Sequence, residues 1–404
     1  MTEKANVPEI RFAGFTDPWE QRKLGDAGTT YGGLSGKTKE DFGHGEAQFV
    51  PYTNVFDNPV TDTKRLESVE IDPSQNKVKY GDAFFTVSSE TPDEVGMSSV
   101  WLSDQEDVYL NSFCFGYRQD STFDPHYLAY MLRSSSVRSG LTLLAQGISR
   151  FNISKNKVME LSVPVPSAVE QKQIGQYFAS LDHLITLHQR KYDKLVQLKK
   201  SMLDKLFPRP GERFPEIRFA GFTDPWEQRK WGEFSKKKTT KNADGALSET
   251  FTNSAEQGVI SQLDYFDHDI TNDANISGYY VVQPDDFVYN PRISVTAPCG
   301  PINRNRLNRA GVMSPLYTVF SEDASVDKTY LEHYFKTSRW HDFMFLEGNS
   351  GARSDRFSIS DATFFEMPIW CPEISEQIAI AKQLETTDSL ITLHQRECGR
   401  PAFT

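Results

Sequence analysis

Hydrophobic positions recur at alternating spacings of four and three residues along one stretch that runs from Glu170 to Leu206. The stripe consists of Ile174, Phe178, Leu181, Ile185, His188, Tyr192, Leu195, Met202 and Leu206, with Lys199 breaking the series. A repeat sustained over about four to five heptads predicts a coiled-coil helix of about 55 Å. The same spacing returns after Ser375 at Ile380, Leu384, Thr387, Ile391 and His394. A second helix is expected there.

Shorter segments rich in Val, Phe and Tyr precede each helix and are bounded by turn residues, which predicts strands. They cover 77–87, 107–118 and 161–166 in the first half, and 277–282, 286–289, 312–321 and 366–370 in the second. Short helices are expected over 127–134 and 330–337, because Asp124 and Asp327 stand at N-cap positions.

The chain is a tandem duplication. Residues 8–23 recur letter for letter as residues 215–230, and residues 184–190 recur as residues 390–396. The copies agree at their edges and differ in the middle, and repeats of this kind decide the architecture before any single element does. One scaffold that presents two different recognition surfaces would produce this pattern.

These patterns predict an α+β fold with two tandem mixed α/β domains separated by long helices. We expect a first globular domain over 1–166, a helix over 167–207, a second globular domain over 208–372 with a linker at 208–214, a second helix over 373–398, and a tail over 399–404. Antiparallel pairing of the helices within the chain would form a coiled coil and relate the domains by a pseudo-two-fold axis; pairing between chains is the alternative. Gly399 and Pro401 predict that the second helix is truncated by about 15 residues relative to the first.

Composition narrows the classes of function. The net charge of −11 over 404 residues argues against a non-specific nucleic-acid binder. No apolar run is long enough for a membrane span, and the polar start shows no signal peptide. Four cysteines without CxxC spacing favour a reduced, cytoplasmic chain. His188 and His394 lie on the heptad stripe and are expected to pack there, and no metal-ligand spacing is present, so no metal site is expected.

The segment Trp-Glu-Gln-Arg-Lys-Leu-Gly at 19–25, and a helix opened by Glu-Gln after a Pro-x-Pro strand, resemble the specificity subunit of type I restriction-modification systems. The resemblance covers nearly the whole chain. It implies that each globular domain is a target recognition domain for one half of a bipartite, asymmetric DNA sequence. It also implies that the helices set the spacing and dock methyltransferase subunits, two of which are expected. A motor-endonuclease subunit would complete the restriction complex. The chain itself would be non-catalytic and without cofactor, since S-adenosylmethionine would bind the methyltransferase.

Base and phosphate contacts need Lys and Arg side chains, which gives a set of candidate DNA-binding residues. In the first half they are Lys37, Lys39, Lys77, Lys79 and Arg150, and in the second half Lys236, Lys237, Lys238, Arg292, Arg304, Arg306, Arg309, Arg353 and Arg356. The Asn-rich run from Arg304 to Arg309 is the favoured groove-entering loop. The segment 150–154 and its counterpart 356–360 read either as a strand with one buried face or as a loop that approaches a phosphate. Each cation also has the simpler interpretation of a solvated surface charge.

A stand-alone DNA methyltransferase or nuclease is the alternative from another class. Residues 290–293, Asn-Pro-Arg-Ile, come near an adenine-methyltransferase Asn-Pro-Pro-aromatic motif but depart from it at the third and fourth positions. No Gly-rich S-adenosylmethionine loop precedes them, and no residues are committed to a flipped base. No catalytic residue is therefore assigned. A pure coiled-coil assembly protein is the third class, and it would leave two globular domains without a role.

Overall fold

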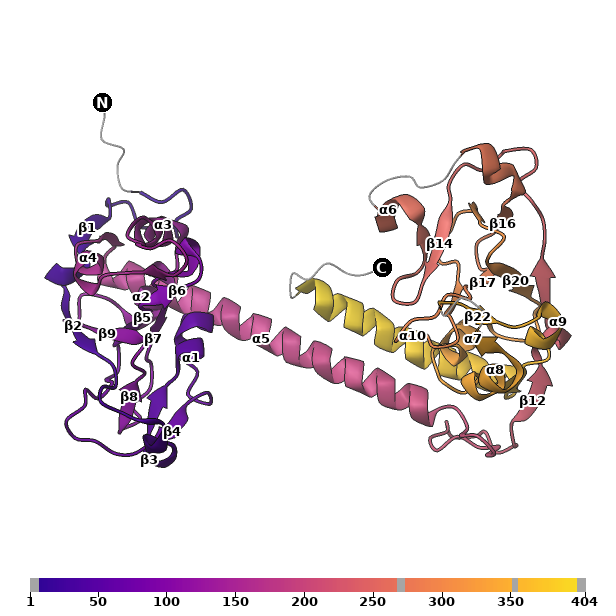
Figure 1. The fold of residues 1–404 in the computed structure, drawn as a ribbon, viewed down its shortest axis with the longest axis horizontal. Helices are drawn as coiled ribbons and strands as arrows, with labels where there is room; N and C mark the ends of the chain where they lie inside the picture. The colour runs from indigo at the N-terminus through magenta and orange to yellow at the C-terminus, as the bar shows by residue number, and fades with distance from the viewer. Residues whose placement is uncertain (1–6, 267–272, 351–354, 398–404) are drawn as a thin grey trace. The chain divides into compact units, whose positions relative to one another are not determined.

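The computed structural model describes residues 7–266, 273–350 and 355–397. The chain divides into two compact units, residues 1–184 and 185–404, and each is described by itself (Figure 1). The division falls inside one helix, α5 (Ala168–Lys205), whose first part packs on the first unit and whose last part belongs to the second. None of the described helices combines the length and apolar character needed to cross a bilayer.

The first unit is built on an antiparallel sheet with strand order β2-β9-β5-β7. Its strands are β2 (Gly28–Gly32), β9 (Cys114–Gln119), β5 (Ala83–Thr86) and β7 (Ser98–Val100). A second sheet has the order β4-β3-β8, formed by β4 (Glu67–Val69), β3 (Phe42–Val50) and β8 (Val108–Leu110). Strands β3 and β8 are parallel, whereas β3 and β4 are antiparallel.

Four short helices complete the globular part of the first unit: α1 (Tyr52–Asp57), α2 (Pro125–Met131), α3 (Ser135–Leu143) and α4 (Lys155–Met159). Helix α2 begins as the sequence predicts, because the Asp124 carboxylate accepts a hydrogen bond from the Tyr127 amide at 3.0 Å. Tyr127 and Leu128 then face the core, where they pack among the buried residues of β5 and β9. The two-stranded pair β6 (Ser88–Ser89) and β10 (Phe151–Asn152) closes one edge.

The second unit repeats this scaffold. Its antiparallel sheet has the order β13-β20-β17-β18, formed by β13 (Ser235–Lys238), β20 (Thr318–Glu322), β17 (Phe287–Tyr289) and β18 (Ile302–Arg304). Helices α7 (Lys328–Tyr334), α8 (His341–Glu347) and α9 (Asp361–Phe364) follow, with the pair β21 (Asn349–Ser350) and β22 (Phe357–Ser358). The strand order and the element sequence match those of the first unit, as expected for a duplicated domain.

The part inserted between the shared strands differs between the two units. Where the first unit has the mixed sheet β4-β3-β8, the second has two antiparallel pairs. These are β14 (Phe251–Ser254) with β15 (Gly258–Ser261), and β16 (Tyr280–Val282) with β19 (Gly311–Met313), next to helix α6 (Gln262–Phe266). The divergent middles of the sequence therefore form different structures on a common sheet.

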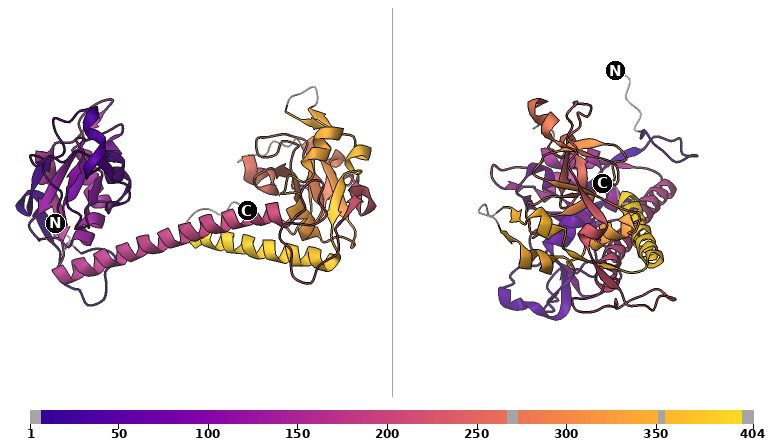
Figure 2. Two further views of the ribbon diagram at one scale, coloured as in Figure 1. Left: turned by 90° about the horizontal axis from the view of Figure 1, so that it is seen from below. Right: turned by 90° about the vertical axis from the view of Figure 1, so that its right-hand side faces the viewer.

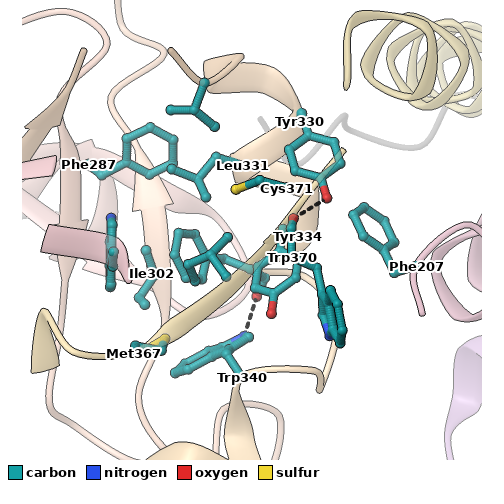
Figure 3. Packing of buried hydrophobic residues seen from close by; sticks show 14 of the residues in the cluster. Phe207, Phe287, Ile302, Tyr330, Leu331, Tyr334, Trp340, Met367, Trp370 and Cys371 are labelled. Carbon is teal, nitrogen blue, oxygen red and sulfur yellow. Dashed lines mark hydrogen bonds between the residues drawn. The ribbon is translucent and has the colours of Figure 1, made fainter. Parts of the chain in front are cut away.

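Aromatic side chains fill the core of the second unit (Figure 3). Tyr330 on α7 is fully buried, and its hydroxyl donates a hydrogen bond of 2.6 Å to the Trp370 carbonyl oxygen on β23 (Pro368–Cys371). Phe207, directly after α5, packs against Tyr330 and against Trp226 in edge-to-face geometry. The end of α5 is thus part of this core.

The start and the end of each globular domain are adjacent strands. In the first unit β1 (Glu20–Lys23) pairs antiparallel with β11 (Ser162–Val165), and in the second unit β12 (Glu227–Lys230) pairs antiparallel with β23. Trp226, immediately before β12 in the repeated block 215–230, is buried and anchors that block to its domain. The strand at the end of each repeated block therefore pairs with the last strand of its own domain.

A bidentate ion pair fixes each long helix to its domain. Arg11 donates two hydrogen bonds to Glu170, at 2.7 and 2.8 Å. Arg218 donates two to Glu376, also at 2.7 and 2.8 Å, on helix α10 (Ile374–Glu397). Both carboxylates are almost completely buried. Parallel N–H···O bonds of this kind restrain orientation as well as distance.

The glutamine that follows each of these glutamates makes a second repeated contact. The Gln171 side-chain oxygen accepts a hydrogen bond of 2.8 Å from the Asp124 amide, and Gln377 accepts one of 2.9 Å from the Asp327 amide. Each glutamine also donates to the carbonyl oxygen of the proline just before its helix. The Glu-Gln dipeptide at the start of each helix is therefore a structural joint.

Helix α10 and the last part of α5 lie side by side in the second unit (Figure 2). His188 contacts His394, Lys199 forms an ion pair with Asp388, and Met202 contacts Thr387, so the pairing is antiparallel. Lys199, which interrupts the heptad stripe in the sequence, is thus satisfied by a carboxylate on the facing helix. The pairing predicted from the two stripes forms within one chain.

Several predicted strands were too long, because local turns divide them. The segment 107–118 contains β8 and β9, separated where the Asn111 side chain accepts from the Phe113 amide in an Asx-type turn. The segment 312–321 contains β19 and β20, separated by a turn in which the Tyr317 amide donates to Ser314. The segment 77–87 yields only β5, because Gly81 adopts a φ of +84° in a turn before it.

Candidate nucleic-acid interface

Of the four candidate lysines in the first unit, Lys37 and Lys77 are paired with carboxylates and Lys39 and Lys79 are not. Lys37 contacts Asp72 at 3.0 Å and is mostly buried, and this hydrogen bond raises the pKa of Lys37. Lys77 contacts Asp107 at 2.5 Å, which raises its pKa in the same way. Lys39 and Lys79 are exposed and form no ion pair with any described residue. A DNA phosphate could bind Lys39 or Lys79 without first displacing a carboxylate.

Arg150 occupies a defined position at the edge of the first unit. Its guanidinium donates to the Ser88 hydroxyl at 2.9 and 3.3 Å, and the following residues form β10 against β6. Of the segment 150–154, only Phe151 and Asn152 form a strand, and Phe151 and Ile153 pack on the core. Arg150 makes no ion pair among the described residues and remains exposed beside this strand.

Strand β13 carries the three consecutive second-unit lysines in three different environments. Lys236 is exposed and forms no ion pair within the described part of the chain. Lys237 contacts Asp361 at 2.5 Å. Lys238 contacts the buried Asp286 at 2.7 Å, where burial raises the pKa of the carboxyl although the lysine opposes this shift. Lys238 is therefore a structural partner of the sheet.

Arg304, the last residue of β18, and the arginines of the loop that follows it are held by carboxylates. Arg304 donates to Asp285 at 2.7 Å and is largely buried. Arg306 bridges Glu332 on α7 and Glu385 on α10, at 2.9 and 3.0 Å. These ion pairs tie the loop to two helices, and binding of a DNA phosphate there would require an exchange of partners.

Arg309, at the end of the same loop, forms a bidentate pair with Glu249, with both hydrogen bonds at 2.7 Å. The pair raises the pKa of Arg309 and lowers that of Glu249. The favoured groove-entering loop is therefore restrained at three arginines, and its contact with DNA stays a prediction.

Arg292 and Arg356 face each other across an antiparallel bridge. Residues directly opposite in such a bridge point to the same face, and like charges in that position repel. Neither guanidinium forms an ion pair with any described residue, so no carboxylate in residues 7–266, 273–350 or 355–397 relieves the repulsion. An anion would relieve it. This pair is the strongest candidate phosphate contact in the second unit; the predicted Arg353 lies outside the described residues.

The near-match to a methyltransferase motif is part of the same corner. The Asn290 side chain donates to the Asn253 carbonyl oxygen at 2.8 Å and accepts from the Arg292 amide at 3.0 Å. Asn253 in turn donates to the Val288 carbonyl at 2.7 Å. Asn290 therefore helps to hold strands β14 and β17 together. This structural role explains the asparagine of the Asn-Pro-Arg-Ile segment.

Several cations that sequence analysis did not single out proved to be structural. Arg133 donates to three backbone carbonyl oxygens, and burial lowers its pKa to about 10. Arg138 does the same for the segment around Gly96. Lys336, the counterpart of Arg133, is more exposed, and its ammonium group donates to the Asn303 side chain. The alignment of Arg133 with Lys336 between the two halves was the available signal, since a cation retained at one scaffold position suits a structural role.

Comparisons with known proteins agree with this architecture. A family model described as the type I restriction modification DNA specificity domain matches residues 16–197. The putative type I restriction enzyme MjaX specificity subunit of Methanocaldococcus jannaschii is 24% identical over 418 residues, which cover 98% of this chain and 92% of that protein. The StySPI specificity subunit of Salmonella potsdam is 23% identical over 186 residues, 45% of this chain and 40% of the relative.

A solved structure shows the same fold. The crystal structure of the type I restriction-modification S subunit from M. genitalium superimposes with a TM-score of 0.55 at 12% sequence identity. The match covers 98% of this chain and 95% of that one, so it includes both globular domains and both long helices. The domain model over residues 16–197, the relative aligned over almost its full length and the shared fold make this chain similar to the specificity subunits of type I restriction-modification systems.

Proposed function

We propose that the chain recognises a bipartite, asymmetric DNA sequence, with each globular domain reading one half of the target. The observation that carries this proposal is the contrast between the two units. They share one sheet order and one helix joint, yet they insert a mixed sheet in one case and two strand pairs in the other. A pair of identical readers related by two-fold symmetry would call for a palindrome, whereas two different readers call for two different half-sites.

In this proposal the long helices set the distance between the half-sites and dock two methyltransferase subunits. The ion pairs Arg11–Glu170 and Arg218–Glu376 support it, because each holds a helix rigidly to one reader. The chain itself is non-catalytic, like the specificity subunits to which it is similar. S-adenosylmethionine would bind the methyltransferase, a motor-endonuclease subunit would add restriction, and the complex would act in the cytoplasm, where its DNA is found.

The cations without carboxylate partners are the proposed DNA contacts. In the first unit they are Lys39, Lys79 and Arg150, and in the second Lys236, Arg292 and Arg356. Phosphate contacts of this kind position a protein on the duplex, and base contacts then supply the sequence preference. Because the net charge of the chain is −11, binding would depend on these local groups and not on bulk attraction.

Reconstitution tests the proposal. The purified chain is mixed with the methyltransferase subunit of its system and S-adenosylmethionine, and methylated adenines are mapped over a long DNA. We expect methylation at a split, non-palindromic motif, and none when either protein is omitted. A chimaera in which both readers derive from residues 24–161 should methylate a motif with two copies of one half-site. Methylation by the chain alone, or an unsplit motif, would contradict the proposal.

A further inference from the structure

Three metal-ligating side chains converge where α10 pairs with α5 in the second unit. His188 lies on α5, and His394 and Glu397 lie one helical turn apart on α10. The two histidines occupy the same position of the repeated segment Leu-Ile-Thr-Leu-His-Gln-Arg. Antiparallel pairing of the two copies brings them face to face, with ring centroids 5.2 Å apart. Spacing along the sequence could not reveal this group, because its members come from two helices.

When Glu397 is ionised, the contacts within this group cannot all be hydrogen bonds. His188 Nδ1 lies 3.0 Å from His394 Nδ1 and 2.5 Å from a Glu397 carboxylate oxygen, and His394 Nδ1 lies 3.1 Å from the same oxygen. Each Nδ1 carries either one proton or one lone pair in the ring plane. If both carry protons, both donate to Glu397 and the two N–H groups collide. If one does, at least one edge of the triangle sets lone pair against lone pair.

A divalent cation would satisfy all three atoms at once. In a tetrahedral site with ligands at about 2.0–2.1 Å, ligand atoms are separated by roughly 3.3 Å. Two of the three separations here, 3.0 and 3.1 Å, are near that value, and the third, 2.5 Å between His188 Nδ1 and the Glu397 oxygen, would have to widen for an ion to bind. Two imidazoles with one carboxylate are a ligand set that suits zinc, and imidazole also suits neighbouring transition metals.

We propose that His188, His394 and Glu397 form a site for a divalent transition-metal ion such as Zn²⁺. All three side chains are partly exposed, so an ion can reach them and a water molecule can take the fourth position. The bound ion joins the last turn of α10 to α5. It fixes the register of the helix pair at the end that lies away from the Arg218–Glu376 joint. The proposed role is structural, because the ion would join two helices that already pack against each other.

Metal titration of the full chain tests this site. The affinity tag is removed, bound metal is stripped with a chelator, and Co²⁺ is added while the visible spectrum is recorded. We expect one equivalent to produce the absorption of a tetrahedral Co²⁺ centre, and Zn²⁺ to displace it and to raise the melting temperature. In the wild-type chain, imidazole ¹⁵N shifts should show ligation at Nδ1 of His188 and His394. This readout needs no variant.

Variants then identify the ligands. His188→Ala and His394→Ala should each weaken Zn²⁺ binding by about tenfold or more, since even the loss of an outer-shell partner costs that much. His183→Ala, which removes an exposed histidine of the same helix outside the triangle, is the matched control and should leave binding unchanged. The proposal is overturned if neither ion binds stoichiometrically, if binding survives both ligand substitutions, or if the ¹⁵N shifts place the ion elsewhere.

Discussion

Arg218 donates two parallel hydrogen bonds to the Glu376 carboxylate, although the sequence of the second globular domain lies between the two residues. Arg218 comes from the repeated block that opens the domain, and Glu376 comes from the first turn of α10. The pair therefore connects the beginning of the domain to the helix that follows its end. Arg11 and Glu170 make the same connection in the first unit.

Loss of the Glu376 carboxylate should destabilise the second unit. Glu376→Ala leaves the Arg218 guanidinium without its partner at a site where the glutamate is 1% exposed, and breaking a buried pair on one side costs about 3 kcal/mol. Urea unfolding of the full chain measures this change. Glu366→Ala breaks the exposed pair with Lys230 and serves as the control, for which little change is expected. Equal effects of the two substitutions would show that the buried pair is no special joint.

Packing between α10 and its domain should depend on residues from one face of the helix. Leu384 is fully buried in the core of the second unit, whereas Leu393 on the same helix is 50% exposed. Leu384→Ala should therefore lower the free energy of unfolding by about 2–5 kcal/mol, because it removes buried methyl groups and leaves a cavity. Leu393→Ala should have a much smaller effect. Thermal or chemical unfolding compares them, and a larger loss from Leu393→Ala would contradict the pairing described.

The second unit should lose stability as the pH rises, because of Glu322. Burial raises the pKa of this carboxyl to about 8, and one of its oxygens has no hydrogen-bond partner among the described residues. Between about pH 4.5 and 8 the folded state keeps a proton that the unfolded chain has released, so unfolding becomes easier across that window. The effect is on the order of 2–4 kcal/mol.

Glu322→Gln should remove most of this pH dependence and stabilise the chain at pH 8. Urea midpoints at pH 5, 6.5 and 8 measure it. Asp323→Asn is the neighbouring control, because hydrogen bonds from Ser325 lower the pKa of Asp323, which gives the opposite sign. If Glu322→Gln leaves the slope between pH 5 and 8 unchanged, the buried carboxyl is not its source.

Salt dependence of DNA binding should separate free arginines from paired ones. Arg292→Ala and Arg356→Ala, tested in the complex with the methyltransferase, should each reduce the slope of log affinity against log salt by about 0.9, the effect of one lost phosphate contact. Arg309→Ala removes an arginine already paired with Glu249 and should leave the slope unchanged. A reduced slope for Arg309→Ala only would contradict this prediction and would favour DNA contact by the β18–β19 loop.

The fold was predictable from sequence to the extent that it depends on repetition and helix periodicity. The heptad stripe predicted α5 nearly to its ends, and Asp124 and Asp327 predicted the starts of α2 and α7, because these signals are local. Strand lengths were less predictable. The turn at Asn111 depends on a side-chain hydrogen bond that no hydrophobic pattern records.

The candidate interface was less predictable than the fold, because charge pairing is set by tertiary contacts. Arg306 is paired with Glu385 on a helix 79 residues later, and Arg292 meets Arg356 across 64 residues. In the sequence all of these arginines look equivalent. Only the folded chain separates the arginines that hold loops in place from those that lack a carboxylate partner.

The pairing of β1 with β11, and of β12 with β23, makes each globular domain an exchangeable module. The first and last strands of each domain pair with each other, next to the start of the long helix. The residues between these two strands can therefore change in number and structure without disturbing the contacts that hold the helix. The chain already contains two such inserted segments, one between Lys23 and Ser162 and another between Lys230 and Pro368. New specificities could be built by replacing the segment between either pair of residues, with the rest of the chain unchanged.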